Sequence, residues 1–277
     1  MLGLLYSLIT LGLTMIFSIM GVLNFAHGQM YVLGGFIIYY FYGRYHFNYF
    51  ISLLICVLIL AAVGALFDKF LFRRVIREAR REESTMLLAM GTALLLEESA
   101  LLLFGEKSRG VPPVVEGVYQ VFGSYLVAQR LFAIGMAVIF IIGLGVFVRY
   151  TKPGMAIRAL AQDKEAAFLQ GVNIHKISML GFAIGAALAG VAGGLLAPIL
   201  MVSSGSGGGI TLKSFIMMLI GGFGSVPGAI LGGLILGFLE AIGYALLPGT
   251  LTYLIIFSLV ILLLIFRPQG IMGRPAG

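Results

Sequence analysis

The sequence has few charged residues, one cysteine and three histidines. Only 10% of its 277 residues are Asp, Glu, Lys or Arg, against about 25% in a typical soluble domain, and 60% are hydrophobic. A water-soluble domain of this size needs more polar surface, so the composition excludes a soluble enzyme. The single cysteine excludes a disulfide framework and a thiolate metal site, and three scattered histidines disfavour a histidine-built one. We therefore expect neither a metal nor a cofactor.

Long apolar runs replace the missing polar surface. The mean hydropathy is +1.08, and the 39 glycines lie inside the apolar runs, which is typical of packed transmembrane helices. The predicted spans are 2–22, 28–42, 50–67, 86–104, 131–148, 177–201, 211–223, 226–246 and 251–266. Two runs, 28–42 and 211–223, are short, so each is a tilted span, a broken helix or a re-entrant piece. The runs lack the alternation of β-barrel strands. We predict an all-α, polytopic membrane bundle of eight or nine spans, with residues 1–277 as one domain.

The basic residues predict how the spans are oriented. The net charge is +7, and most of the excess lies in the stretches 68–84 and 149–176 and in the tail after 266. Cytoplasmic loops of membrane proteins carry such an excess, so we place these three stretches in the cytoplasm and 105–130 outside as an ordered loop. We do not read the charge as a nucleic-acid site. No Lys or Arg precedes Arg44, so the N-terminus lacks the basic region of a signal peptide.

Polar residues interrupt the first two runs. Asn24, His27 and Gln29 lie at or near membrane depth, and Gly28 lets the chain break its helix there. Polar groups in hydrocarbon are costly and normally face the protein interior or a wet path. These residues therefore belong either to a substrate path or to a plain cytoplasmic turn in which His27 only caps a helix.

Carboxylates also lie within the predicted spans. Glu97 and Glu98 lie about 18 Å from the cytoplasmic end of their run, counted at 1.5 Å per residue, and Glu240 lies similarly deep. An intramembrane carboxylate attracts a cationic group, couples to protons or pairs with Arg or Lys. We favour a structural role for Glu98. For Glu97 and Glu240 a place on the substrate path and a structural role both stay open.

Small residues recur at a spacing of four. Such pairs allow helix backbones to approach closely. The pairs are Gly181 and Gly185, Gly190 and Gly194, Gly228 and Gly232, and Gly233 and Gly237. The stretch Ser203–Gly209 is predicted to be a flexible outer connection, and it lacks the Gly-Lys-Ser/Thr ending of a phosphate-binding loop.

The stretch 149–176 predicts a short cytoplasmic helix. Good helix formers run from Met155 to Leu169, and Gly171 is a stop signal. A short helix on such a loop docks into a partner's groove or is a solvated surface helix. Its composition alone favours the solvated helix.

Five short motifs stand out along the chain. They are Leu23–Gly28, Gly154–Ala159 with Asp163 and Gly171–Asn173, the Gly-rich stretch Gly221–Ala229, the C-terminal stretch Phe266–Pro275, and Glu165–Gly171. Together they resemble motifs of the permease subunit of a branched-chain amino acid ABC importer, the leucine/isoleucine/valine type. Glu165–Gly171 also resembles the EAA loop of ABC importer permeases in general.

The resemblance implies a multi-subunit importer in the inner (plasma) membrane. Two cytoplasmic ABC ATPases would drive it, a second homologous permease would complete the path, and an extracytoplasmic binding protein would deliver substrate. No P-loop occurs in this sequence, so we expect a transport subunit without an ATPase site of its own. The residues implied in ATPase coupling are Arg158, Asp163, Glu165, Ala166, Ala167 and Gly171. The residues implied in hinges and packing are Gly28, Gly221, Gly222, Gly224 and Gly228.

The substrate stays open. Similar permeases carry urea or short amides, and Asn24 and His27 suit these as well as leucine-like amino acids. An ion-coupled transporter or channel that uses Glu97 and Glu240 is an alternative from another class. An inverted repeat of Asn24–Gly35 and Gly221–Gly233, two Gly-rich hinges, would suit either class.

Overall fold

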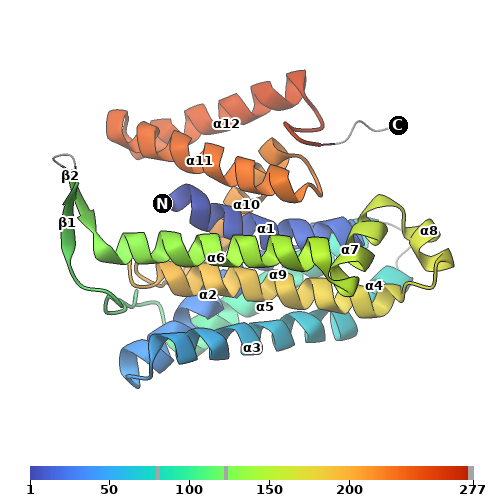
Figure 1. Ribbon diagram of the computed structural model, residues 1–277, viewed down its shortest axis with the longest axis horizontal. Helices are drawn as coiled ribbons and strands as arrows, with labels where there is room; N and C mark the ends of the chain where they lie inside the picture. Colours follow the sequence, from blue (N-terminus) through green and yellow to red (C-terminus); the bar gives the residue numbers. More distant parts are fainter. Residues whose placement is uncertain (79–81, 122–123, 274–277) are drawn as a thin grey trace.

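The computed structural model describes residues 1–78, 82–121 and 124–273, so Arg80, Arg81, Arg274 and Pro275 of the stretches above lie outside the described residues. The chain forms a bundle of long helices with one β-hairpin at its end (Figure 1). The first half contains α1 (Leu2–Met20), α2 (His27–Ile38), the π-helix η1 (Tyr39–Arg44), α3 (Tyr49–Phe67), the π-helix η2 (Asp68–Phe72), α4 (Arg73–Glu78) and α5 (Glu82–Phe104). The second half contains β1 (Val118–Val121), β2 (Ser124–Val127), α6 (Ala128–Tyr150), α7 (Lys152–Gln162), α8 (Lys164–Leu169), α9 (Ile174–Leu196), the 3-10 turn η3 (Ser204–Ser206), α10 (Gly207–Gly221), α11 (Val226–Leu246) and α12 (Gly249–Phe266).

Seven helices of the described residues are long and apolar enough to cross a membrane. They are α1, α3 with its π-helical extension, α5, α6, α9, α11 and α12. This confirms the all-α prediction, but the predicted eight or nine spans exceed this number. The two short runs form α2 and α10, of 12 and 15 residues. Both begin inside the bundle, so neither helix alone reaches from one end to the other.

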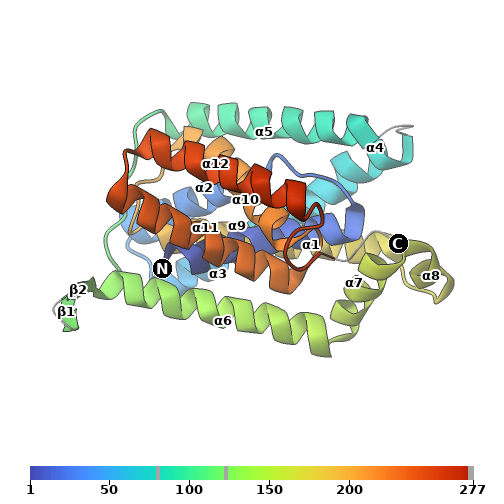
Figure 2. The same cartoon turned by 90° about the horizontal axis from the view of Figure 1, so that it is seen from above.

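The helices lie roughly parallel to one long axis, which gives the bundle two distinct ends (Figures 1 and 2). We call the end with α4, α7 and α8 the basic end, and the end with β1 and β2 the hairpin end. The described parts of all three basic stretches lie at the basic end, as their predicted placement on one side of the membrane requires. The loop 105–130, which is predicted to lie outside, contains the antiparallel pair β1–β2, which the sequence analysis missed.

Helices α2 and α10 both start about halfway along the bundle, and each follows a stretch of chain that is not α-helical. Gly21, with φ +72°, ends α1, and the chain then returns without a helix to His27. The imidazole Nε2 of His27 lies 2.9 Å from the carbonyl oxygen of Ile9, near the middle of α1. The start of α10 contacts the start of α2, since a Cβ on Gly28 would collide with the carbonyl oxygen of Gly207. The two half-helices therefore meet near the middle of the bundle.

This meeting corrects the interpretation of the stretch Ser203–Gly209. It does not form a flexible outer connection, because η3 leads the chain inward and the last three glycines begin α10. Its glycines do not indicate flexibility here; the lack of a side chain at Gly207 allows close contact with α2 instead. The Gly207 position faces the Gln29 side chain at a distance that leaves no room for a Cβ.

The two halves of the chain form an inverted repeat. Helix α11 packs along α1, and α3 packs along α9, while α1 and α9 cross each other in opposite directions. The first unit is thus α1, α2, α3 and α5, and the second is α9, α10, α11 and α12. The counterpart of the break before α2 is the break before α10. The predicted pairing of Asn24–Gly35 with Gly221–Gly233 is therefore wrong in its second member, which forms the end of α10, the following turn and the start of α11.

Glycines bring the crossing helices into backbone contact. A Cβ on Gly12 would lie 2.5 Å from the carbonyl oxygen of Gly185, and a Cβ on Gly185 would lie 2.6 Å from that of Gly12. The four predicted small-residue pairs are confirmed as close contacts. Their partners are Ile19 and Gly12 for the first pair, Leu60 and Ile38 for the second, Gly221 and Met217 for the third, and Ser7 and Gly3 for the fourth.

The predicted helix from Met155 to Leu169 is two helices, α7 and α8, with a break at Asp163. Asp163 has extended backbone angles, and its carboxylate accepts the N–H groups of Glu165 and Ala166 at 2.9 and 3.0 Å. This cap stabilises a new helix start, which interrupts the helix formers on either side.

Replacing Gly12 with Ala tests the glycine contact. We expect G12A to lower the free energy of unfolding by about 1–3 kcal/mol, because the added methyl group collides with the backbone of α9. Thermal unfolding of the purified protein can be followed by the reaction of the buried Cys56 thiol with a maleimide dye. The matched control is G143A on α6, where a Cβ has nothing within 4 Å. Equal transition temperatures for G12A and G143A would contradict the packing argument.

Candidate functional site

Asn24 and His27 hold the break between α1 and α2 in place. The Asn24 side-chain oxygen accepts the N–H of Ala26 at 3.1 Å, and His27 is tethered to Ile9 as described above. Both side chains are buried within the subunit, and the His27 Nδ1 has no partner. Within the subunit they stabilise non-helical backbone at membrane depth, where unpaired polar groups are costly. A direct role of Asn24 or His27 on the substrate path stays a prediction.

Gln29 joins the half-helices to α5. Its Nε2 donates a hydrogen bond to Glu97 Oε2 at 3.0 Å, and its carboxamide lies against Gly207 at the start of α10. Glu97 is half-buried, whereas Glu98 is exposed on the outer face of α5. The structure thus brings Gln29 and Glu97 together. The sequence placed them 68 positions apart and gave no sign of this contact.

Glu240 lies in a separate cluster towards the hairpin end. Its Oε1 pairs with Lys213 Nζ at 2.7 Å, and its Oε2 accepts the Tyr6 hydroxyl at 2.8 Å. These residues come from α11, α10 and α1, and a cavity of about 260 Å³ borders Lys213, Glu240 and Tyr253. Of the roles left open for Glu240, the structure shows pairing with a lysine. Lys213 was missed, although it is the one basic residue in the run 211–223.

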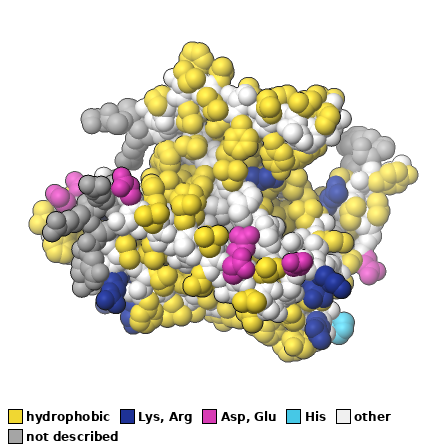
Figure 3. All heavy atoms as spheres, turned by 180° about the vertical axis from the view of Figure 1, so that it is seen from behind, with side chains coloured by type: hydrophobic (Ala, Val, Ile, Leu, Met, Phe, Trp, Pro, Cys, Tyr) yellow, Lys and Arg dark blue, Asp and Glu magenta, His cyan; other side chains and the backbone are white. Residues whose placement is uncertain are grey.

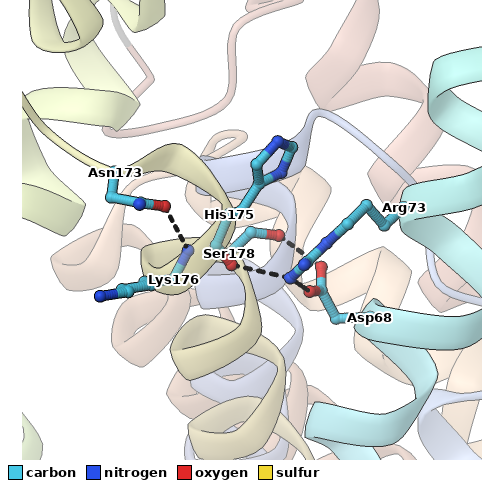
Figure 4. A network of polar contacts seen from close by, with 6 residues as sticks. All are labelled: Asp68, Arg73, Asn173, His175, Lys176 and Ser178. Atoms are coloured by element: carbon cyan, nitrogen blue, oxygen red, sulfur yellow. Dashed lines mark hydrogen bonds and ion pairs between the residues drawn. The ribbon is translucent and has the colours of Figure 1, made fainter.

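A second buried carboxylate, also missed, lies at the basic end (Figure 4). Asp68 Oδ2 pairs with Arg73 at 2.7 Å, and Asp68 Oδ1 accepts the Ser178 hydroxyl at 2.5 Å. The Arg73 guanidinium also donates to the carbonyl oxygen of His175 at 3.0 Å. Asp68 follows α3 and Ser178 lies on α9, so this contact is the inverted counterpart of Glu240 on α11 with Tyr6 on α1. Each end of the bundle thus has a carboxylate that ties one repeat to the other.

The helix α8 projects beyond the basic end (Figure 1). Ala167 is only 4% exposed, but the neighbouring Phe168 and Leu169 are 64% and 82% exposed. Of the other predicted coupling residues, Arg158 donates to the carbonyl oxygen of Arg149 at 3.2 Å, whereas Glu165 and Ala166 are exposed. Gly171, with φ +81°, ends the segment. The tip of α8 is therefore an exposed apolar surface on a polar segment.

This projecting segment is linked to α1 and to the Gly-rich turn after α10. Lys164 Nζ donates to the carbonyl oxygen of Met20, the last residue of α1, at 3.1 Å. A cavity of about 760 Å³ lies between α7, the end of α1 and the turn 223–227. A displacement of α7 and α8 would therefore act on the end of α1.

Four of the five predicted hinge glycines, all except Gly28, lie in or beside this turn. Gly222 and Gly224 have φ of +103° and +73°, a region that side chains with a Cβ disfavour. Gly221 and Gly228 are in backbone contact with each other, and Gly28 is in backbone contact with Gly207 of α10. The main chain of Ile271 and Met272 bonds to Ile220 and Gly221. The described C-terminal segment thus fixes the turn. A close backbone contact is visible for Gly28, Gly221, Gly222 and Gly228, whereas Gly224 is favoured by its positive φ.

Half-helices that meet inside a bundle, together with a projecting loop helix, define a polytopic membrane permease of α-helical type. The match to a family model agrees. The model of the branched-chain amino acid transport system permease component matches residues 1–265. The chain therefore belongs to the branched-chain amino acid transport system permease family, and it is a multi-pass membrane protein. Within the described ranges, no group of three or more His, Cys, Asp or Glu could hold a metal ion.

Curated relatives cover nearly the whole chain. The high-affinity branched-chain amino acid transport system permease protein LivH of Salmonella typhimurium is 34% identical over 99% of this chain and 93% of its own length. LivH of Escherichia coli K12 is 32% identical over the same shares, and BraD of Pseudomonas aeruginosa is 32% identical over 98% and 92%. No solved structure matches the chain.

The pair of Lys213 and Glu240 can be tested by comparing the single variant K213M with the double variant K213M/E240Q. We expect K213M to lower the free energy of unfolding by about 3–5 kcal/mol, because it leaves the buried Glu240 carboxylate without its counter-ion. The double variant K213M/E240Q should lose less than K213M alone, since the remaining amide is neutral. Thermal unfolding by Cys56 labelling measures both. A double variant that is less stable than K213M would refute the pairing.

Proposed function

We propose that the chain is the membrane subunit of an ATP-driven importer for branched-chain or other hydrophobic amino acids in the inner (plasma) membrane. A second homologous permease completes the path, and two cytoplasmic ATPases bind at the basic end. An extracytoplasmic binding protein delivers substrate to the hairpin end. The observation that carries this proposal is the exposed apolar tip of α8, on a chain of this permease family. The printed names of the relatives support the substrate class.

The geometry supports a mechanism of coupling. Phe168 and Leu169 insert into a groove of the ATPase, as an exposed helix tip does in helix-in-groove recognition. Closure of the ATPases moves α7 and α8, and the Lys164 contact transmits this movement to α1. Because α1 crosses α9 at Gly12 and Gly185, the two inverted repeats then tilt against each other around the half-helices. This movement exposes the middle of the bundle alternately to the two sides.

The structure weighs against ion coupling through Glu240. A carboxylate that binds a transported proton or cation alternates between free and occupied states, whereas Glu240 is paired with Lys213 and Tyr6. A path for urea or short amides within the same family is the nearer alternative, because the carboxamide and carboxylate groups of Gln29 and Glu97 suit such solutes too.

Uptake into proteoliposomes tests the proposal as a whole. Vesicles that contain the complete transporter should accumulate leucine only with ATP and with the binding protein on the opposite side. Urea serves as the competing solute. Leucine uptake driven by a proton or sodium gradient without ATP would overturn the proposal, and uptake of urea in preference to leucine would replace its substrate.

The docking of α8 has a separate test. Replacing Leu169 with Asp should reduce uptake by about tenfold or more, because a carboxylate cannot be buried in an apolar groove without a partner. L169M is the matched control and should retain uptake. Since Leu169 is exposed in the subunit, the thermal transition of L169D should equal that of the unmodified chain, whereas a charge at the buried Ala167 would also disturb folding. Normal uptake by L169D would exclude docking through this tip.

A further inference from the structure

The start of α10 is open towards the outside of the subunit. Gly208 and Gly209 are exposed, and a Cβ on either would have nothing within 4 Å. The first N–H groups of an α-helix have no partner within the helix, and here Ser206 provides no side-chain cap. The first turn of α10 also contains no acidic residue of its own. No residue of α10 therefore balances the partial positive charge of the helix dipole, and the carboxylate close by is Glu97 of α5, whose Oε1 lies 3.9 Å from where a Cβ on Gly205 would be.

The start of α2 differs in this respect. Its preceding turn is closed by the Asn24 side chain, and the N–H of Gly28 donates to the Thr211 hydroxyl at 2.9 Å. The two half-helices are counterparts in the inverted repeat, but only one of them has its first turn satisfied by protein side chains. This asymmetry singles out the start of α10.

Gln29 supplies an independent observation at the same place. The side chain is 2% exposed, and its Nε2 is bonded to Glu97. Its Oε1 is buried beside Gly207 and has no hydrogen-bond partner. A buried acceptor without a partner is destabilising. This oxygen therefore indicates a donor that the subunit itself does not provide.

These groups lie at membrane depth. Glu97 precedes the end of α5 by seven residues, or about 10 Å along the helix. The neighbouring Glu98 is exposed, and Figure 3 shows acidic side chains near the middle of a predominantly hydrophobic face. Carboxylates and open helix ends are not stable against lipid tails. This face of α5 and α10 therefore borders a wet path or the second permease.

We propose that this place binds the two charged groups of the transported amino acid. The substrate carboxylate lies at the start of α10, where it accepts the N–H groups of Gly208 and Gly209, as anions do at helix N-termini. The substrate ammonium donates to Glu97 and to the free Oε1 of Gln29. The inference rests on the proposed function and specifies how that function recognises its substrate class.

The arrangement selects zwitterions with an apolar side chain. Leu94 on α5 and Leu212 on α10 are exposed one helical turn from Glu98 and Gly208, and they offer apolar surface to a branched side chain. Urea has neither an ammonium nor a carboxylate, so it would leave both the helix start and the Glu97 carboxylate without a charged partner. The site thus favours amino acids over neutral amides.

Replacing Gly208 tests the carboxylate contact. Proline removes the N–H at the second helical position, which Pro153 and Pro227 already occupy in α7 and α11. We expect G208P to reduce leucine uptake by at least about tenfold, the effect of losing a hydrogen bond to a charged group. G208A keeps the N–H and has room for its methyl group, so it should retain most of the uptake. Equal uptake by G208P and G208A would overturn the carboxylate contact.

Protection from labelling tests binding without ATP. In a C56A background, G209C in the purified transporter should react with a water-soluble maleimide, and millimolar leucine should slow the reaction several-fold. Neither 3-methylbutylamine, which lacks the carboxylate, nor 4-methylpentanoate, which lacks the ammonium, should do so at equal concentration. Replacing Glu97 with Gln should abolish protection by leucine. The control G143C lies on α6, where leucine should have no effect on labelling.

The results separate the inference from the proposed function. If leucine is imported with ATP but does not protect G209C, or if the two analogues protect equally well, the site is refuted and the importer stands. If leucine protects G209C but is not imported with ATP, the site stands and the proposed function fails.

Discussion

The close crossing of α1 and α9 is the constraint on which the rest of the bundle depends. In lipid there is little hydrophobic drive between helices, so their association relies on backbone proximity and packing. Gly12 and Gly185 allow these two antiparallel helices to approach closely, and α11 packs against α1 while α3 packs against α9. Only because α1 and α9 are this close can the half-helices α2 and α10 meet beside them.

Polar groups at membrane depth follow from that arrangement. Two half-helices leave non-helical backbone inside the bundle, and His27, Asn24 and Thr211 satisfy much of it. The carboxylates Asp68 and Glu240 link the two repeats at opposite ends of the bundle. Each carboxylate pairs with a basic residue of its own half of the chain and accepts a hydroxyl group from the other repeat. In this conformation the two repeats are thus linked at both ends, while the middle keeps an unsatisfied polar group at Gln29, beside Glu97.

Much of the fold could be predicted from the sequence, because lipid imposes strong rules on it. The length of apolar runs predicted the long helices, and glycine pairs at a spacing of four predicted close contacts that are observed. The predicted number of spans was too high, because hydropathy cannot distinguish a helix that crosses the membrane from one that starts halfway. Asp163 was missed as a helix break because its capping bonds compete locally with good helix formers. Ser203–Gly209 was misjudged because glycine suits both a flexible loop and a tight contact.

The sequence by itself determined that this chain spans a membrane as helices, belongs to a permease family and has a basic loop with a short helix between two spans. These properties depend on composition and local motifs, which a residue carries regardless of its neighbours in space. Only the tertiary structure decided which polar residues meet: Gln29 with Glu97, Tyr6 with Lys213 and Glu240, and Ser178 with Asp68. Their partners are 68 to 234 positions apart, and no local pattern brings them together. Packing within the first repeat joins Gln29 to Glu97, and the inverted packing of the two repeats joins Tyr6 and Ser178 to their partners.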